Sequence, residues 1–223
     1  MSVRTAEGPS RSHKGWAVGA ALTGITGALL AIEFPIIGDL ATPDYDALRQ
    51  FISELGAGGA TNAQWINHFG FLPAGVLLTS FSVLAWMALP RKGATTAGFL
   101  GTALYAIGYI AAVFFPCGAG CAVDSEDPVQ LLHNFFGIAG YLTAPGALIC
   151  FAIGARAWPD ANLLSRLGWV YAAVAALGLA GLMTDLPYRG LWQRILEAGV
   201  LIWCLTGALY LARQPFKSRS IGT

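Results

Sequence analysis

Six apolar segments, each close to the length needed to cross a bilayer, divide this sequence of 223 residues. A transmembrane helix needs about 20 mostly apolar residues, because the hydrocarbon core is about 30 Å thick and a helix rises about 1.5 Å per residue. The segments are Trp16–Phe34, Trp65–Leu89, Gly98–Phe115, Leu131–Ala155, Leu167–Thr184 and Leu191–Ala212. Only 11% of the residues are charged, against about 25% in soluble domains. The sequence therefore predicts an all-α integral membrane bundle of six transmembrane helices.

The distribution of Lys and Arg predicts the orientation of this bundle, because cytoplasmic loops and tails are rich in both residues. If both termini are cytoplasmic, 10 of the 13 basic residues lie on that side, and Arg49, Arg189 and Arg194 remain outside. No small-residue cleavage site follows the first apolar run, so we expect it to be a retained span and not a signal peptide. We therefore expect cytoplasmic tails at residues 1–15 and 213–223 and a transmembrane domain at residues 16–212.

The first outer loop has the pattern of a short amphipathic helix. Thr42, Pro43 and Asp44 have the order of a helix start, with a capping hydroxyl, a proline in the first turn and then an acid. Apolar residues follow with helical spacing at Leu48, Phe51, Ile52 and Leu55, and Gly56 is a suitable stop. This segment is too short to span, so we expect a helix on the outer membrane surface or over the end of the bundle.

The four cysteines fall into two groups. Cys150 and Cys204 lie inside predicted spans, where cysteine is a small apolar side chain. Cys117 and Cys121 lie in the second outer loop, in FPCGAGC, and a disulfide between them would be stable on an oxidising side of the membrane. A redox-active pair and a zinc site with a histidine are the alternatives, but no second reactive pair accompanies these cysteines. We predict a structural disulfide and no metal.

Polar residues recur where the second, fourth and sixth spans begin at the outer side. Each span starts with a glutamine, and a polar residue three or four positions further on lies on the same helix face about one turn deeper. The three groups are Gln64, Asn67 and His68, then Gln130, His133 and Asn134, and then Gln193, Arg194 and Glu197. Positions 64, 130 and 193 put the glutamines 66 and 63 residues apart, which suggests three repeated helical hairpins.

These polar side chains should face the interior of the bundle, because an unpaired polar group in lipid costs several kcal/mol. We therefore expect a polar cup that opens to the outer side and is closed toward the cytoplasm. The predicted ligand-binding residues are Asn67, His68, Gln130, His133, Asn134, Gln193, Arg194 and Glu197, together with Ser53 and Glu54 from the first outer loop. Within this set, we expect His133 to lie near His68 and near an Arg194–Glu197 pair.

Several of these residues also have a simpler interpretation. His68 and His133 can sit at headgroup level and bind water or neighbouring helices, and Arg194 can extend to lipid phosphates. The candidates for acid–base chemistry are His133, His68, Glu197 and Glu54. Ser53 becomes a nucleophile only if a histidine folds over it. No HExxH-type spacing, nucleophile elbow or phosphate loop is present, so the sequence assigns no reaction and no cofactor.

The motifs YDALRQFISELGAGG, FPCGAGC, LLHNFFG and GLWQRI occur in this order along the six spans. With them, the chain resembles a bacterial membrane family known as domain of unknown function 998, from about Trp16 to Ala212. The resemblance implies functional weight on Tyr45, Ser53, Glu54, Gly56, Asn67, Pro116, Cys117, His133, Gln193 and Arg194. An acid often follows the first cysteine in that family, whereas Gly118 stands here. The resemblance also implies the inner membrane of a bacterium, and the family name carries no activity.

Three functions fit these observations. The first is the binding, and conceivably the modification, of a lipid or other amphiphile in the outer polar cup. The second is a non-catalytic scaffold or accessory subunit, for which a small stapled bundle suffices. The third is a small transporter, although carriers commonly place their sites near the bilayer midplane. Membrane lipids are the expected partners, and a net charge of +1 gives no indication of nucleic-acid binding. The sequence assigns no oligomeric state.

Overall fold

The computed structural model describes residues 11–122, 124–184 and 186–214, so most of the two predicted tails lies outside the described residues. The long helices are α1 (Arg11–Ala41), α3 (Leu72–Ala88), α4 (Gly93–Phe114), α5 (Pro128–Gly154), α6 (Asn162–Leu182) and α7 (Arg189–Arg213). The short elements are η1 (Ile52–Gly56), α2 (Ala63–Trp65), η2 (Ile66–Phe71), η3 (Ala119–Cys121) and η4 (Ala155–Ala157). All regular structure in the described part of the chain is helical.

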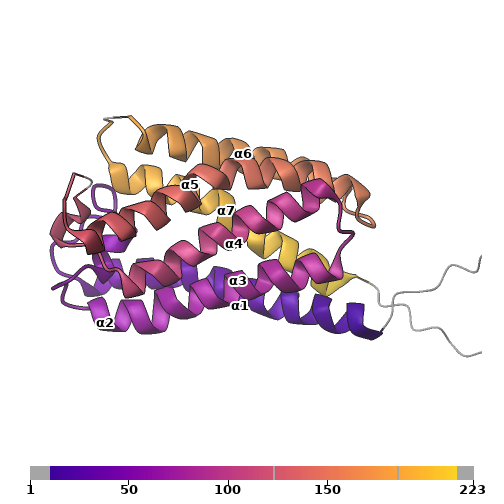
Figure 1. Ribbon diagram of the computed structural model, residues 1–223, viewed down its shortest axis with the longest axis horizontal. Helices are drawn as coiled ribbons and strands as arrows, with labels where there is room; N and C mark the ends of the chain where they lie inside the picture. Colours follow the sequence, from indigo (N-terminus) through magenta and orange to yellow (C-terminus); the bar gives the residue numbers. More distant parts are fainter. Residues whose placement is uncertain (1–10, 123, 185, 215–223) are drawn as a thin grey trace, which may run out of the picture.

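Six helical segments are long and apolar enough to cross a membrane, as the sequence predicted, and α2, η2 and α3 together form the second of them. The chain is therefore a multi-pass membrane protein. Each long helix packs mainly against its neighbours in the sequence, and α1 closes the ring by packing against α7. The beginning of α1 and the end of α7 lie at the same end of the bundle, on the right of Figure 1. We call this the termini end. The opposite end, which carries the connections 42–62, 115–127 and 183–188, we call the long-loop end.

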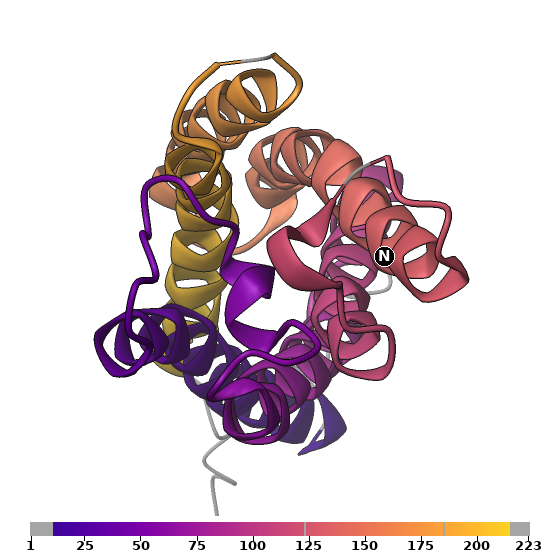
Figure 2. The same cartoon turned by 90° about the vertical axis from the view of Figure 1, so that its left-hand side faces the viewer.

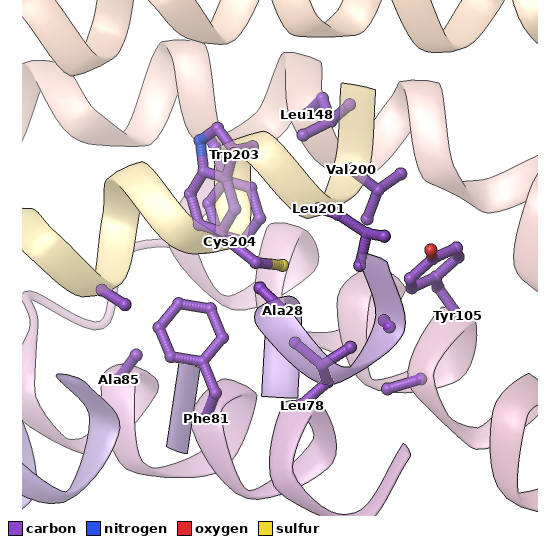
Figure 3. Close-up of a cluster of buried hydrophobic side chains, with 14 of the residues drawn as sticks. Ala28, Leu78, Phe81, Ala85, Tyr105, Leu148, Val200, Leu201, Trp203 and Cys204 are labelled. Carbon is purple, nitrogen blue, oxygen red and sulfur yellow. The ribbon is translucent and has the colours of Figure 1, made fainter. Parts of the chain in front are cut away.

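The interior near the termini end is filled by aromatic side chains. Trp203 of α7 stacks on Phe151 of α5, with ring centroids 3.6 Å apart. Phe81 and Phe99 pack against the other sides of this pair, and Trp158 covers it next to η4. Figure 3 shows Trp203, Phe81 and Cys204 pointing toward one another from α7 and α3. Because these rings leave the bundle axis closed at this end, any large internal space has to lie nearer the long-loop end.

The helices are longer than predicted: α4 begins at Gly93 and not at Gly98, and α6 at Asn162 and not at Leu167. In the first two spans the difference involves proline. The first span was predicted to end at Phe34, but α1 continues through Pro35 to Ala41, which is possible because neighbouring helices compensate a proline in a membrane span. In the second span, Pro73 follows the π-helix η2, in which the Leu72 amide bonds to the Asn67 carbonyl. The wider π turn absorbs the backbone group that proline leaves free. It also places Asn67 among the buried residues of this span.

The first loop does not form the amphipathic helix that its sequence pattern predicted. Turns occupy most of residues 42–50, Asp44 has a positive φ of 63°, and only the 3-10 helix η1 is helical. The reason is that α7 binds carbonyl groups that a continuous helix would use: the Leu48 carbonyl accepts from the Leu191 amide, and the Arg49 carbonyl accepts from the Arg189 side chain. The loop folds inward, and η1 lies over the middle of the ring of helices (Figure 2).

Candidate functional site

A pocket of about 220 Å³ lies inside the ring at the long-loop end. Its walls come from α4, α5 and α7 and from the end of α6, and residues 51–53 together with Cys121 border it at the long-loop end. Most of its lining is apolar, including Phe71, Phe136 and Ile138. The polar groups are few, and five of them belong to the predicted set: Ser53, His133, Asn134, Gln193 and Glu197. The polar cup that the sequence predicted therefore corresponds to a largely apolar pocket with a small polar part.

Glu197 is the acid that lines this pocket, and 5% of its surface is exposed. Three tyrosine hydroxyl groups donate hydrogen bonds to its carboxylate. Tyr105 and Tyr109 of α4 both bind Oε2, the latter at 2.6 Å, and Tyr141 of α5 binds Oε1 at 2.7 Å. Three donors suit an ionised carboxylate, because an ionised carboxylate only accepts hydrogen bonds. The cluster links α4, α5 and α7 across the interior of the ring.

Gln193 connects this cluster to the first loop. Its Nε2 donates to the Tyr141 hydroxyl at 2.6 Å, and its Oε1 accepts from the Ile52 amide at 2.6 Å. Gln193 is 5% exposed and lies one helical turn before Glu197. Gln193 thus holds Ile52 of the loop, which lines the pocket, and also orients Tyr141, which binds the Glu197 carboxylate.

His133 and Asn134 form the border of the pocket on α5, and Gln130 lies beside them outside the lining. The His133 ring binds the Phe115 carbonyl through Nδ1 at 2.8 Å; since a carbonyl only accepts, Nδ1 carries the hydrogen. This leaves Nε2 as the acceptor of the ring. Gln130 accepts from the Gly118 amide at 2.8 Å and donates to Asn134 at 2.8 Å. Gln130 therefore holds the cysteine loop in place, whereas His133 and Asn134 line the pocket.

Cys117 and Cys121 are at disulfide distance, with their Cα atoms 5.0 Å apart. The loop between them packs on residues 53–58: the Ser53 hydroxyl lies 3.4 Å from the Cys121 sulfur, and the Gly58 amide donates to the Cys117 carbonyl at 2.8 Å. With His133, the two cysteines group three potential metal ligands within 4.8 Å of one another. Metals bind the thiolate form of cysteine, so this group could hold an ion only after reduction of the disulfide.

Arg194 and Glu54 serve the first loop and are not among the residues that line the pocket. The Arg194 guanidinium donates to the Tyr45 hydroxyl at 2.9 Å and to the Gln50 carbonyl at 3.3 Å. Burial raises the pKa of Tyr45 and nearby Arg194 opposes this shift; the neutral hydroxyl donates to the Phe51 carbonyl at 2.9 Å. The expected Arg194–Glu197 pair is therefore not formed. The reason is that the loop supplies the guanidinium with other partners.

The Glu54 carboxylate is bound on both oxygens within the same loop region. It accepts from the Phe51 amide at 2.9 Å, from Gln50 Nε2 at 3.1 Å and from Arg189 Nη2 at 2.9 Å. Its side chain is 6% exposed, whereas that of Arg189 is 42% exposed. This geometry gives Glu54 a structural task, namely to join the loop to the beginning of α7.

His68 and Asn67 also lie outside the pocket. His68 is exposed on the second span and binds the Gln64 carbonyl at 2.8 Å, so the structure does not bring it to His133 as expected. The π turn of η2 and the local bond to Gln64 account for this placement. Asn67 is buried and donates to the Gly56 carbonyl at 2.9 Å. A Cβ atom at Gly56 would overlap the Asn67 amide oxygen, so this contact requires glycine at position 56.

Sequence reasoning did not identify the three tyrosines. Tyr105 and Tyr109 are four residues apart, which places both hydroxyl groups on one face of α4. That spacing was a usable signal. The signal is not specific, because tyrosine is also common at membrane interfaces, where its hydroxyl reaches water.

The fold and the site together define a multi-pass helical membrane protein with an internal pocket near one end. A known family covers most of this bundle: its profile, described as Protein of unknown function (DUF998), matches residues 25–210. The chain belongs to this family. No curated protein and no solved structure matches it.

Proposed function

We propose that the chain binds a lipid or another amphiphilic molecule in the pocket between α4, α5 and α7. The observation that carries this proposal is the division of the pocket into apolar walls and one polar cluster around Glu197. An amphiphile matches this division, because its head group can bind the polar cluster while its chain contacts the apolar wall. Ligand pockets for small molecules usually have a few fixed polar groups in a mainly apolar lining.

The size and borders of the pocket favour a ligand that is only partly enclosed. Its volume of about 220 Å³ is below the range of about 300–1,000 Å³ for small-molecule sites. One border runs from Ile138 of α5 to Leu182 and Met183 at the end of α6. Ile138 is 41% exposed and Met183 is 60% exposed, on a surface that would contact lipid. A head group fits inside, and an acyl chain can leave between these residues into the bilayer.

The charge distribution supports a position of this pocket on the extracytoplasmic side. At the termini end, the described chain carries Arg91, Lys92, Arg156, Arg166 and Arg213. The three arginines near the long-loop end, Arg49, Arg189 and Arg194, all bind groups of the first loop. Under the positive-inside rule, the termini end faces the cytoplasm and the pocket opens near the outer leaflet.

Filling the pocket tests this proposal. Gly137 lines the pocket, and a Cβ atom there would meet no atom within 4 Å, so Gly137→Leu adds volume to the pocket without a backbone clash. Gly146→Leu is the matched control, because Gly146 is also on α5, has equally open surroundings and does not line the pocket. We expect mass spectrometry of lipid extracts to find a lipid that co-purifies with the wild type and with Gly146→Leu.

The same lipid should be reduced severalfold in Gly137→Leu. Equal lipid content in all three proteins, with Gly137→Leu folded, would contradict the proposal. The scaffold function would then be favoured, since it requires no occupied pocket.

A further inference from the structure

The charge inside the pocket narrows the class of head group. Among the described residues that line the pocket, Glu197 is the only acid, and neither Lys nor Arg is present. The titratable base of the lining is His133, on the border toward the cysteine loop. An anionic head group would have to approach the buried carboxylate without a compensating Lys or Arg. The electrostatics therefore disfavour a phosphate or carboxylate at the deep end.

The carboxylate of Glu197 retains capacity for another hydrogen bond. A carboxylate offers about four acceptor positions. Oε2 accepts from Tyr105 and Tyr109, whereas Oε1 accepts only from Tyr141. One acceptor position on Oε1 is thus unused by the described residues.

The Glu197 carboxylate forms no ion pair with a Lys, Arg or His side chain among the described residues. Its hydrogen bonds come from the three tyrosines, and Arg194 acts on it only through space, because the Arg194 guanidinium is hydrogen-bonded to Tyr45 and Gln50. A buried charge in a membrane protein is normally paired with an opposite charge. A cationic group on the ligand would supply this pairing, and a protonated amine would in addition donate to the unused position of Oε1.

Aromatic rings surround the carboxylate. Tyr105 has its ring centroid 5.7 Å from that of Tyr109 and 6.4 Å from that of Tyr141. Phe71 packs against Tyr109 at 5.9 Å, and Phe71 and Phe136 also line the pocket. Ammonium groups are attracted by aromatic rings, and sites for alkylated ammonium ions commonly combine several rings.

We propose that the pocket selects an amphiphile with a cationic ammonium head group, which binds between the Glu197 carboxylate and the rings of Tyr105, Tyr109 and Tyr141. This inference rests on the proposed amphiphile binding and specifies its ligand. The ammonium group is common to phospholipids with amine head groups and to single-chain ammonium amphiphiles. The site recognises the charge and the rings, and the chain of either molecule can follow the border near Ile138 and Met183.

Two probes that differ mainly in net charge test the inference. Dodecyltrimethylammonium is cationic, and dodecyldimethylamine oxide has a similar size and no net charge at pH 8. Binding is measured by competition with radiolabelled dodecyltrimethylammonium on the full chain in phosphatidylglycerol nanodiscs, with the signal of protein-free nanodiscs subtracted. We expect the cation to bind about tenfold more tightly, because one desolvated charge or cation–aromatic contact supplies a factor of this size.

Glu197→Gln should abolish this preference while the amine oxide still binds, since glutamine keeps an acceptor oxygen for the tyrosines but has no charge. Added phosphatidylethanolamine should compete with the labelled probe. Tetramethylammonium, which lacks a chain, should compete weakly. Strong competition by tetramethylammonium would identify a small ammonium ion as the ligand and would overturn the proposal that the ligand is an amphiphile. Equal affinity of wild type for the two probes would overturn the ammonium inference even if Glu197→Gln does not fold. If wild type binds the two probes equally and Gly137→Leu binds neither, the pocket is still supported as an amphiphile site.

Discussion

The two buried acids among the described residues, Glu54 and Glu197, have the same side chain but different surroundings. Glu54 accepts hydrogen bonds from the Phe51 amide, Gln50 and Arg189, so its charge is paired within the first loop. Glu197 accepts hydrogen bonds only from tyrosine hydroxyl groups and lines the pocket. Pairing makes the first acid a structural residue, and the lack of a paired cation makes the second acid a candidate for ligand binding.

Replacement of Glu54 by glutamine should destabilise the protein. Glu54→Gln removes the negative charge that binds Arg189 and replaces one acceptor oxygen of the carboxylate by an NH2 group. Hydrogen bonds to charged groups contribute about 1.5–3 kcal/mol to stability. We expect a lower midpoint of thermal unfolding in detergent, monitored by tryptophan fluorescence. Glu33→Gln is the control, because Glu33 is exposed on α1. A midpoint of Glu54→Gln equal to that of the control would contradict the structural role.

Part of the site was predictable from single residues, and the limits have physical reasons. The cost of a polar group in lipid correctly placed His133, Gln193 and Glu197 in the interior. The same principle cannot say which partner each group finds. Arg194 binds loop carbonyls because the first loop folds inward, and that fold depends on contacts between segments about 140 residues apart in the sequence.

At the scale of elements, the first loop shows why an amphipathic pattern does not suffice to predict a helix. Ile52 and Leu55 are buried as the pattern requires, but they belong to a short 3-10 helix over the ring and not to an amphipathic α-helix. Contacts to the beginning of α7 replace the intrahelical hydrogen bonds, and Gly190 permits them, since a Cβ atom there would overlap the Gln50 and Ala47 carbonyls. Six spans, by contrast, follow from length and apolarity alone and were predicted correctly.

Close packing of α6 against α7 supports the pocket from one side. A Cβ atom at Gly178 of α6 would overlap the backbone of Leu196, the neighbour of Glu197. We predict that Gly178→Ala destabilises the protein by about 1–3 kcal/mol, the usual cost of overpacking. The measurement is again the midpoint of thermal unfolding.

Gly146→Ala is the matched control for this substitution. Its surroundings are open, and alanine favours a helix over glycine by about 0.5–1 kcal/mol, so its midpoint should stay equal or rise. A rise of similar size in both variants would show that α6 and α7 are not in close contact at Gly178.

At the scale of the whole molecule, the two halves of the bundle differ in composition and task. The half at the termini end has a continuous aromatic interior around Trp203 and Phe151, whereas the half at the long-loop end holds the pocket and the loops that cover it. The six spans form the three helical hairpins α1–α3, α4–α5 and α6–α7, each joined at the long-loop end, and a repeat among them stays a prediction. The polar residues at the beginning of the returning helices nevertheless differ in task, because those of the second and third hairpins line the pocket and those of the first hairpin do not.

Whether this pocket serves the outer leaflet depends on the orientation of the bundle, which the basic residues predict and which labelling can measure. Glu126→Cys places a thiol at an exposed position of the long-loop end, and Gly93→Cys places one at an exposed position of the termini end. The native Cys150 and Cys204 are in membrane spans, and Cys117 and Cys121 are paired, so the new thiols should dominate the reaction with a membrane-impermeant maleimide. In spheroplasts that express the chain, we expect Glu126→Cys to be labelled and Gly93→Cys to be labelled only after lysis.

The reverse pattern would place the pocket at the inner leaflet, and any ammonium lipid would then have to come from the cytoplasmic side. This outcome would also require Arg91, Lys92, Arg156 and Arg166 to lie outside, against the bias that governs the insertion of short loops.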